Sequence, residues 1–349
     1  MKMIRVALLA GVLLVAGCGK DKTTQPDGGN GSGTSRYLLI GHRYDIVLKD
    51  LRYGSETYLT SDSSDVEDGN AQFSYNGNRI IWYRFPRPVG NEVWIMNRDG
   101  GNKAKIADGV LDPVNAVSDN NLVVLRARDV NSHALDSIIV ADFSGNVINE
   151  FHIGSWIDHV QWTLGGDRIL YDLSAGGLYI MNSDGSGQHL LTNTNLGDFG
   201  FMASPNSNMI ALCPSEGGNH LELFNLIDST QTVLVPSDMW GETGQAIDLV
   251  INWSGDSQRI FFTRDSDTTL CHVGISGGAS QALAQHARGP CVSNDGTRIA
   301  YSVRFPAADS LPSGDCQIVV ANVNGANPTV VFSALPFYFA HWIGVHDFY

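Results

Sequence analysis

Short apolar segments alternate with polar turns along most of this chain, and one such unit recurs many times. Residues 162–171 read Trp-Thr-Leu-Gly-Gly-Asp-Arg-Ile-Leu-Tyr: an apolar strand end, a Gly/Asp turn and an apolar run. The same frame lies at residues 73–82, 203–212, 253–262 and 292–301, with a shorter copy at 117–124. Two β-prone segments joined by a polar Asn/Asp/Gly turn predict a β-hairpin.

A second hairpin follows each of these units. Its turn opens with Asp or Asn in six of seven cases and with Ile in the other: Asp50, Asn97, Asp142, Asn182, Asn225, Ile275 and Asn322. Successive openers lie 40 to 50 residues apart. Two hairpins in a period of this length predict a four-stranded blade. A closed ring of blades buries the faces and protects the edges that a single blade leaves exposed.

The two ends of the repeat region complement each other. Residues 37–60 supply three strands without the hairpin unit that precedes them elsewhere, and residues 339–345 read as a lone first strand. We therefore expect an all-β fold, a single β-propeller over residues 37–349 whose C-terminal strand completes the first blade. Seven blades are expected, with six or eight as the alternatives.

The pattern Trp-Ser-x-Asp-Gly-x-Arg-Ile-x-Phe, followed by Ile-x-Asn-x-Asp-Gly, resembles the TolB-like propeller repeats, a WD-like class of blade. The resemblance covers residues 36–349, with six copies in phase. Similar repeats form the propeller domains of prolyl-oligopeptidase-type enzymes. Typical TolB propellers have six blades and a separate N-terminal domain, and this sequence departs from both. The resemblance implies a propeller of four-stranded blades.

The N-terminus has the organisation of an export signal. A basic segment precedes an uncharged stretch at residues 6–16, which is too short to span a bilayer as a helix but suits a signal peptide. The following Val-Ala-Gly-Cys18 resembles a lipobox, in which the cysteine is lipidated and becomes the mature N-terminus. An ordinary signal peptide with a coincidental cysteine is the alternative. We expect a signal peptide over residues 1–17 and a membrane anchor through lipid on Cys18.

The segment after Cys18 contains no large apolar residue up to Ser35. We expect residues 18–36 to be a flexible tether. By the same resemblance to lipoproteins, Gly19 after the cysteine favours an outer-membrane location, periplasmic or surface-facing, in a Gram-negative cell.

The charge of the chain and its cysteine content limit the classes of function that it can have. The chain has 36 acidic against 22 basic residues, a net charge of −14, which repels nucleic acid phosphates and anionic lipid heads. We therefore expect no nucleic acid partner. Apart from Cys18 there are four cysteines, for which disulfides and buried free thiols are both open and the thiols are slightly favoured: Cys213, Cys271, Cys291 and Cys316.

The variable loops of the propeller share one face, and loops on a rigid scaffold commonly carry binding sites. An arginine recurs where the second strand of a blade enters its loop, at Arg43, Arg84, Arg126, Arg264 and Arg304. Trp156 and Trp240 lie in loops on the same face. Arginine with exposed aromatics is common at interaction hot spots. The alternative, which we favour, is that these arginines pair with acids of the neighbouring blade.

The sequence offers little catalytic chemistry. Residues 274–278 formally match a serine nucleophile elbow but occupy a hairpin turn, so we expect no catalytic residue, metal or cofactor. The leading hypothesis is a scaffold that binds a protein or peptide through its loop face. The alternative is a lyase- or hydrolase-like propeller enzyme that acts on an anionic polysaccharide. It requires histidines to converge at the channel mouth, chosen from His42, His133, His159 and His341.

Overall fold

A computed structural model gives the fold of the chain. It describes residues 36–42, 44–61, 66–74, 76–86, 91–108, 116–118, 120–127, 136–163, 166–196, 200–205, 207–214, 220–236, 251–264, 268–293, 295–304, 316–334 and 343–348. The elements that can be bounded within these residues are all β-strands. None of the described residues forms a helix long and apolar enough to cross a membrane.

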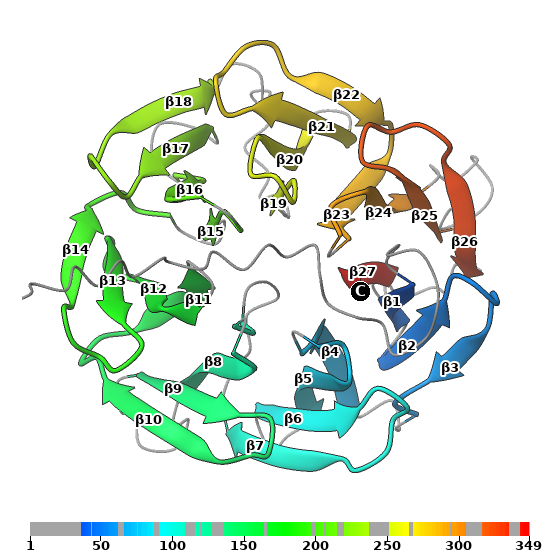
Figure 1. Ribbon diagram of the computed structural model, residues 1–349, viewed down its shortest axis with the longest axis horizontal. Helices are drawn as coiled ribbons and strands as arrows, with labels where there is room; N and C mark the ends of the chain where they lie inside the picture. Colours follow the sequence, from blue (N-terminus) through cyan, green and yellow to red (C-terminus); the bar gives the residue numbers. More distant parts are fainter. Residues whose placement is uncertain are drawn as a thin grey trace, which may run out of the picture. The chain divides into compact units, whose positions relative to one another are not determined.

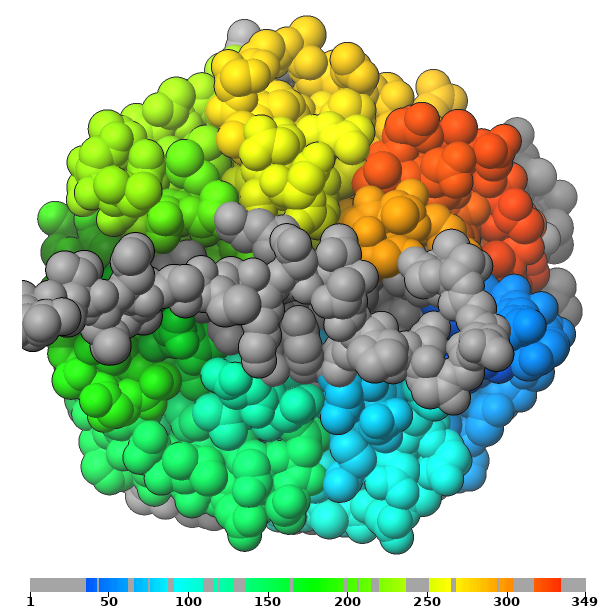
Figure 2. Space-filling view, viewed as in Figure 1, coloured from blue at the N-terminus to red at the C-terminus, as the bar shows by residue number. Residues whose placement is uncertain are grey.

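Within the described residues, twenty-seven strands form seven antiparallel sheets. The sheets are arranged as the blades of a ring (Figures 1 and 2). The strands, blade by blade, are β27 (Ile343–Phe348), β1 (Tyr37–His42), β2 (Asp45–Asp50) and β3 (Glu56–Tyr58); β4 (Val66–Phe73), β5 (Arg79–Pro86), β6 (Glu92–Asn97) and β7 (Ala104–Asp108); β8 (Leu122–Ala127), β9 (Ser137–Asp142) and β10 (Val147–His152); β11 (Ile157–Thr163), β12 (Arg168–Leu173), β13 (Leu178–Asn182) and β14 (His189–Thr192); β15 (Phe201–Ala203), β16 (Met209–Leu212), β17 (Leu221–Asn225) and β18 (Gln231–Val235); β19 (Asn252–Trp253), β20 (Arg259–Arg264), β21 (Thr269–Gly274) and β22 (Gln281–Ala284); β23 (Ala287–Val292), β24 (Arg298–Arg304), β25 (Cys316–Asn322) and β26 (Thr329–Ala334). The prediction of a seven-bladed propeller is confirmed.

The third blade has three strands of regular length, and its innermost position is reduced to a bridge between Val117 and Val123. This blade contains the shortened copy of the repeat. The amide of Val124 donates to the carbonyl of Ala116, which extends the pairing on the inner side.

The ring closes through the C-terminal strand, as the sequence predicts. Strand β27 pairs antiparallel with β1, with Leu38 opposite Phe348 and His42 opposite Ile343. Strand β27 includes residues 343–345 of the predicted closing strand, and residues 339–342 lie outside the described residues. Trp342 lies outside the described residues. Pairing the C-terminal strand with the first blade seals the edge that β1 exposes.

The repeat motif forms a hydrogen-bonded turn between the first and second strands of a blade. In the sixth blade, Ser254 Oγ donates to Asp256 Oδ1 at 2.5 Å, and Ser254 Oγ accepts from the amide of Arg259 at 2.9 Å. Ser293 and Asp295 repeat this arrangement in the seventh blade. The Ser-x-Asp spacing thus provides partners for turn amides that the strand ladder leaves unpaired.

The hydrophobic core lies between neighbouring blades. One cluster joins Leu39 and Ile46 of the first blade to Ile80 and Trp82 of the second. Another joins residues of the second and third blades, including Ile81 and Val123. Burial of each such side chain stabilises the fold by about 1.5–3 kcal/mol. Because every interface needs two blades, stability depends on the closed ring.

Candidate functional site

The antiparallel order of the strands divides the connections between two faces. The turns from first to second strand and from third to fourth strand lie on one face, which we call the short-turn face. The connections from second to third strand and from one blade to the next lie on the opposite face, which we call the loop face. Trp156, which precedes β11, and Arg126, near the end of β8, therefore belong to the loop face, as predicted.

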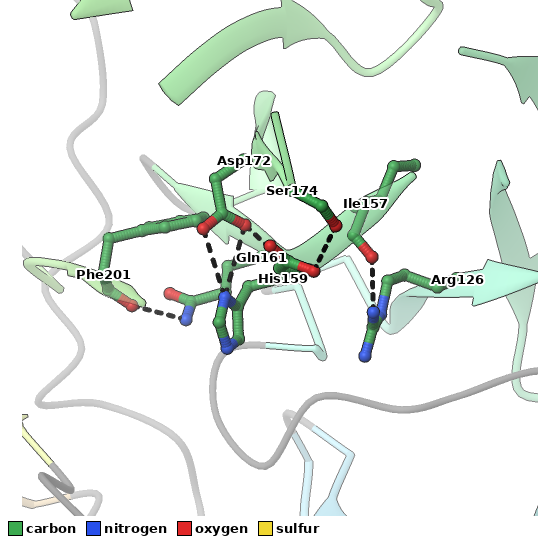
Figure 3. Close-up of polar contacts among 8 residues, drawn as sticks. Arg126, Ile157, His159, Gln161, Asp172, Ser174 and Phe201 are labelled. Atoms are coloured by element: carbon green, nitrogen blue, oxygen red, sulfur yellow. Dashed lines mark hydrogen bonds and ion pairs between the residues drawn. The ribbon is translucent and has the colours of Figure 1, made fainter. Parts of the chain in front are cut away.

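Arg126 and Asp136 of the third blade hold one peptide segment of the fourth blade. The Arg126 Nη1 donates to the carbonyl of Ile157 (Figure 3). Asp136 Oδ2 accepts from the amide of the same residue at 2.9 Å. Asp136 is 1% exposed. The two side chains fix the start of β11, and with it the position of the neighbouring Trp156. One acceptor of Arg126 is therefore a backbone carbonyl of the next blade.

Trp156 has a 39% exposed side chain. Its carbonyl accepts from the amide of Ser174, at 3.0 Å, so its backbone is tied to the end of β12. Ser174 Oγ in turn donates to Asp158 Oδ1 at 2.5 Å. An exposed indole on a backbone held from both sides can bind a partner with little loss of conformational entropy.

His159 forms a pair with Asp172 beside this tryptophan. Figure 3 shows His159 on β11 and Asp172 on β12 facing each other. The Nδ1 atom lies 3.2 Å from both carboxylate oxygens, and the amide of His159 donates to Asp172 Oδ1 at 2.7 Å. Asp172 is 2% exposed, whereas the His159 side chain is 23% exposed. A carboxylate at Nδ1 orients the ring and directs Nε2 to the opposite side.

The space for the His159 ring depends on Gly200. A Cβ at Gly200 would lie 3.1 Å from His159 Nδ1, and the φ of +65° at this glycine disfavours other residues. Phe201 contacts the ring edge to face, with centroids 6.4 Å apart. The fourth and fifth blades together thus shape this part of the loop face.

Sequence reasoning did not single out Asp172 or its contact with His159. The sequence does contain a sign of this contact, because Asp172 directly follows the apolar run Ile-Leu-Tyr within a buried strand. A carboxylate in such a position requires a partner.

Arg84 lies above a buried carboxylate of its own blade. Its Nη1 lies 3.5 Å from Asp68 Oδ2, and its guanidinium stacks on the Trp94 ring at 5.5 Å. Asp68 also accepts from Trp82 Nε1 at 2.8 Å. The Asp68 side chain is fully buried, while that of Arg84 is 18% exposed. Arg84 therefore pairs with an acid of its own blade.

The remaining predicted residues are only partly covered by the structure. Arg264 ends β20 with a half-buried side chain, and Arg304 ends β24, with its side chain outside the described part. Arg43, Trp240 and Cys18 lie outside the described residues. Whether these arginines and tryptophans bind a ligand stays a prediction.

The described histidines named for the enzyme alternative lie in different blades. His42 in the first blade contacts Tyr58, with Nδ1 3.0 Å from its hydroxyl, while His159 in the fourth contacts Asp172. His133 and His341 lie outside the described residues. Among those described, no three His, Cys, Asp or Glu side chains group as a metal site would require. Residues 274–278 form the turn between β21 and β22, with Gly277 N donating to Gly274 O.

Three of the four cysteines are free and buried: Cys213, Cys271 and Cys291. Burial raises the pKa of the Cys213 thiol well above its usual range, which keeps it protonated and unreactive. These thiols contribute to the core rather than to a redox site.

No family model and no curated protein matches the sequence. Solved structures match its fold. A prolyl endopeptidase structure superposes with a TM-score of 0.61 at 11% identity, over 89% of this chain and 50% of that one. An oligogalacturonate lyase in complex with manganese gives 0.53 at 12% identity, over 77% and 82% of the two chains. A putative TolB from Agrobacterium tumefaciens gives 0.49 at 12% identity, over 90% and 91%.

The shared feature is the β-propeller fold. The chain spans half the length of the prolyl endopeptidase, and at these identities the likeness extends to architecture alone. Propellers include enzymes and binding proteins, so function has to be argued from side chains.

Proposed function

We propose that this protein is an envelope-anchored lipoprotein whose propeller binds a protein or peptide through its loop face. The observation that supports this is the exposed Trp156, held on a fixed backbone beside the Arg126–Asp136 contacts and the His159–Asp172 pair. Tryptophan with nearby arginine and histidine offers an apolar surface flanked by hydrogen-bonding groups. Such a combination is typical of protein interaction sites.

Site-specific photocrosslinking tests the binding face. A photoreactive phenylalanine derivative replaces Trp156 in the full-length protein, expressed in its own cell envelope, and crosslinked products are identified by mass spectrometry. Ile227, 77% exposed in a turn of the short-turn face, is the matched control position. We expect one reproducible partner from position 156 that is absent from position 227. Identical products from both positions, or none from position 156, would contradict the proposal.

Anchoring is tested separately by fractionation. We expect Cys18→Ala to leave the protein unprocessed or in the soluble fraction, because the lipid on Cys18 is the proposed anchor. Unlipidated precursor should be detectable by mass. An unchanged membrane fraction of the processed variant would contradict lipid anchoring while leaving the binding face open to its own test.

The polysaccharide-enzyme alternative gains no specific support from the described residues. His42 and His159 each contact a side chain of their own blade and belong to the first and fourth blades. The similarity to oligogalacturonate lyase is one of fold. The binding scaffold therefore remains the better supported proposal.

A further inference from the structure

A stack of alternating arginine and tyrosine side chains lies on the short-turn face of the first two blades. Its order is Arg98, Tyr37, Arg36, Tyr53 and Arg52. The guanidinium carbons of Arg98 and Arg36 lie 4.5 and 4.8 Å from the centre of the Tyr37 ring. Those of Arg36 and Arg52 lie 5.0 and 5.4 Å from that of Tyr53. Contacts of this kind hold the cations in fixed positions over the rings.

The stack joins the first and second blades, and hydrogen bonds made by Arg98 and Arg36 hold it in place. Arg98 comes from the turn after β6 and donates through Nη1 to the carbonyl of Gly77 at 3.1 Å. Arg36 donates twice to the carboxylate of Asp50, at 2.5 and 3.0 Å. These hydrogen bonds lower the pKa of Asp50, so this carboxylate stays ionised and neutralises Arg36. The charges of Arg52 and Arg98 remain at the surface.

Positive charge gathers around this stack. The turns and strand ends of the two blades on this face carry six cations against four carboxylates: Arg36, Lys49, Arg52, Arg79, Arg98 and Lys103, with Asp50, Glu56, Asp99 and Asp347. The described turns of the other five blades reverse the balance, with Asp142, Asp167, Asp184, Asp228, Asp256 and Asp295 against Arg168, Arg259 and Arg298. Although the net charge of the chain is −14, the short-turn face of the first two blades is therefore locally basic. We call this region the basic–aromatic patch.

The patch also coincides with the point where the chain enters the propeller. Arg36 is the first described residue and directly follows the predicted tether. If the 18 residues from Cys18 to Ser35 behave as the predicted tether, a random coil of that length would have a root-mean-square span of about 20–25 Å. A lipid on Cys18 would hold the patch near the bilayer at high effective concentration, so weak contacts would suffice. Tyr53, 69% exposed beside Arg52, suits the interfacial region of a bilayer.

We propose that the basic–aromatic patch docks the short-turn face of the propeller onto an anionic lipid surface. Docking in this orientation turns the loop face, with Trp156, away from the membrane and toward a partner. The tether argument rests on the proposed lipid anchor, whereas the affinity of the patch for lipid does not.

Vesicle binding tests the patch without the anchor. The mature chain, residues 18–349 with Cys18→Ser, purified in unlipidated form, is sedimented with vesicles of phosphatidylcholine alone or mixed equally with phosphatidylglycerol. We expect binding to the mixed vesicles only, decreasing as NaCl is raised. The double variant Arg52→Gln/Lys103→Gln should lower the partition coefficient about 25-fold, since each cation near an anionic surface contributes roughly fivefold.

The matched control removes the same charge from the same face. Arg168→Gln/Arg259→Gln lies in the fourth and sixth blades and should leave binding within about twofold, because these cations lie among acids outside the patch. Tyr53→Ser tests the aromatic contribution independently and should also weaken binding. Failure of the starting chain to bind mixed vesicles, or an equal loss in the control, overturns the proposal.

A competition experiment distinguishes binding to a lipid surface from binding of a single small anion. Inorganic phosphate, compared with NaCl at equal ionic strength, should compete no better than chloride. Stronger competition by phosphate would overturn membrane docking in favour of a small anion site. Neither result affects crosslinking at position 156, so failure of this inference is distinguishable from failure of the binding scaffold.

Discussion

The side-chain amide of Gln161 donates a hydrogen bond to the backbone carbonyl of Phe201, at 2.7 Å, from the innermost strand of the fourth blade to that of the fifth. Two equivalent residues make the same kind of link. Gln72 Oε1 accepts from the amide of Ala116 in the next blade at 3.0 Å, and Asn252 Nδ2 donates to the carbonyl of Pro290 at 3.4 Å. The amides occur in the second, fourth and sixth blades and join the blades in pairs.

The Gln161 link predicts a measurable loss of stability on replacement. Gln161 is 3% exposed, so its amide has exchanged water for the Phe201 carbonyl. We expect Gln161→Met, which keeps the length of the side chain, to lower the free energy of unfolding in urea by about 1 kcal/mol. Removal of Oε1, which has no hydrogen-bond partner in the described part of the chain, offsets some of the cost.

Gln281→Met is the control for this measurement, because Gln281 is exposed on an outer strand. Its free energy of unfolding should change by less than about 0.5 kcal/mol. Equal losses for the two variants would show that the inter-blade link contributes nothing specific.

The Ser-x-Asp turn predicts a pH-dependent effect at Ser254. The hydrogen bond from Ser254 lowers the pKa of Asp256, and backbone amides assist. A carboxyl whose folded-state pKa is lowered stabilises the protein above its unfolded pKa, and this stabilisation is lost as the pH falls through the folded value. Ser254→Ala should therefore destabilise the protein by about 1 kcal/mol at neutral pH, and less once the pH falls below the ordinary pKa of Asp.

Urea unfolding of both proteins at a series of pH values provides the check. Ser276→Ala, an exposed serine in the turn after β21, controls for the loss of a hydroxyl. A constant difference between Ser254→Ala and the starting protein at every pH would show that the Asp256 charge is not involved.

The fold could be predicted from sequence because each blade repeats its own turn chemistry. Ser293, Asp295 and Gly296 take part in one turn and occur in register with Ser254 and Asp256. Six copies in phase fix the blade boundaries even where one turn is a residue shorter. The closing strand could be predicted because residues 37–60 lack a first strand, which the C-terminal segment supplies by pairing with β1.

The candidate site was harder to predict from the sequence, because its contacts join residues of different blades. That Arg126 would bind the carbonyl of Ile157 depends on how the third blade packs against the fourth, and periodicity does not specify this. The basic–aromatic patch was missed for a related reason. The net charge is a sum over the whole chain and does not show where charges gather on the surface. Arg98 and Arg36 come together at Tyr37 only in the folded ring.

Arg84 allows the structural and binding interpretations of the recurring arginine to be separated. Its guanidinium is the cation that the structure places by the buried carboxylate of Asp68. We expect Arg84→Met to destabilise the protein by about 2 kcal/mol, because it leaves this charge poorly compensated. In the double variant with Asp68→Asn the loss should be smaller than the sum of the single losses. Additive losses, combined with a lost crosslinked partner, would instead assign Arg84 to binding.

Gly200 predicts a specific steric effect on the His159–Asp172 pair. Gly200→Ala places a methyl group 3.1 Å from His159 Nδ1 and adds a side chain at a φ of +65°. Gly289 has a φ of +59°, and a Cβ at this residue would meet no atom within 4 Å, so Gly289→Ala is the matched control for backbone strain alone. Both variants should lose about 1–2 kcal/mol from the positive φ, and Gly200→Ala about 1 kcal/mol more from the clash.

A double-mutant cycle shows whether the added loss acts through the ring. If the methyl group displaces His159 from Asp172, then Asp172→Asn costs less in the Gly200→Ala background than in the starting protein, as measured by urea unfolding. Crosslinking from position 156 should weaken in the same variant, since Trp156 and His159 flank one β11 segment. An unchanged cost of Asp172→Asn would mean that the ring accommodates the methyl group without leaving its carboxylate, and the shape of this part of the loop face would not depend on Gly200.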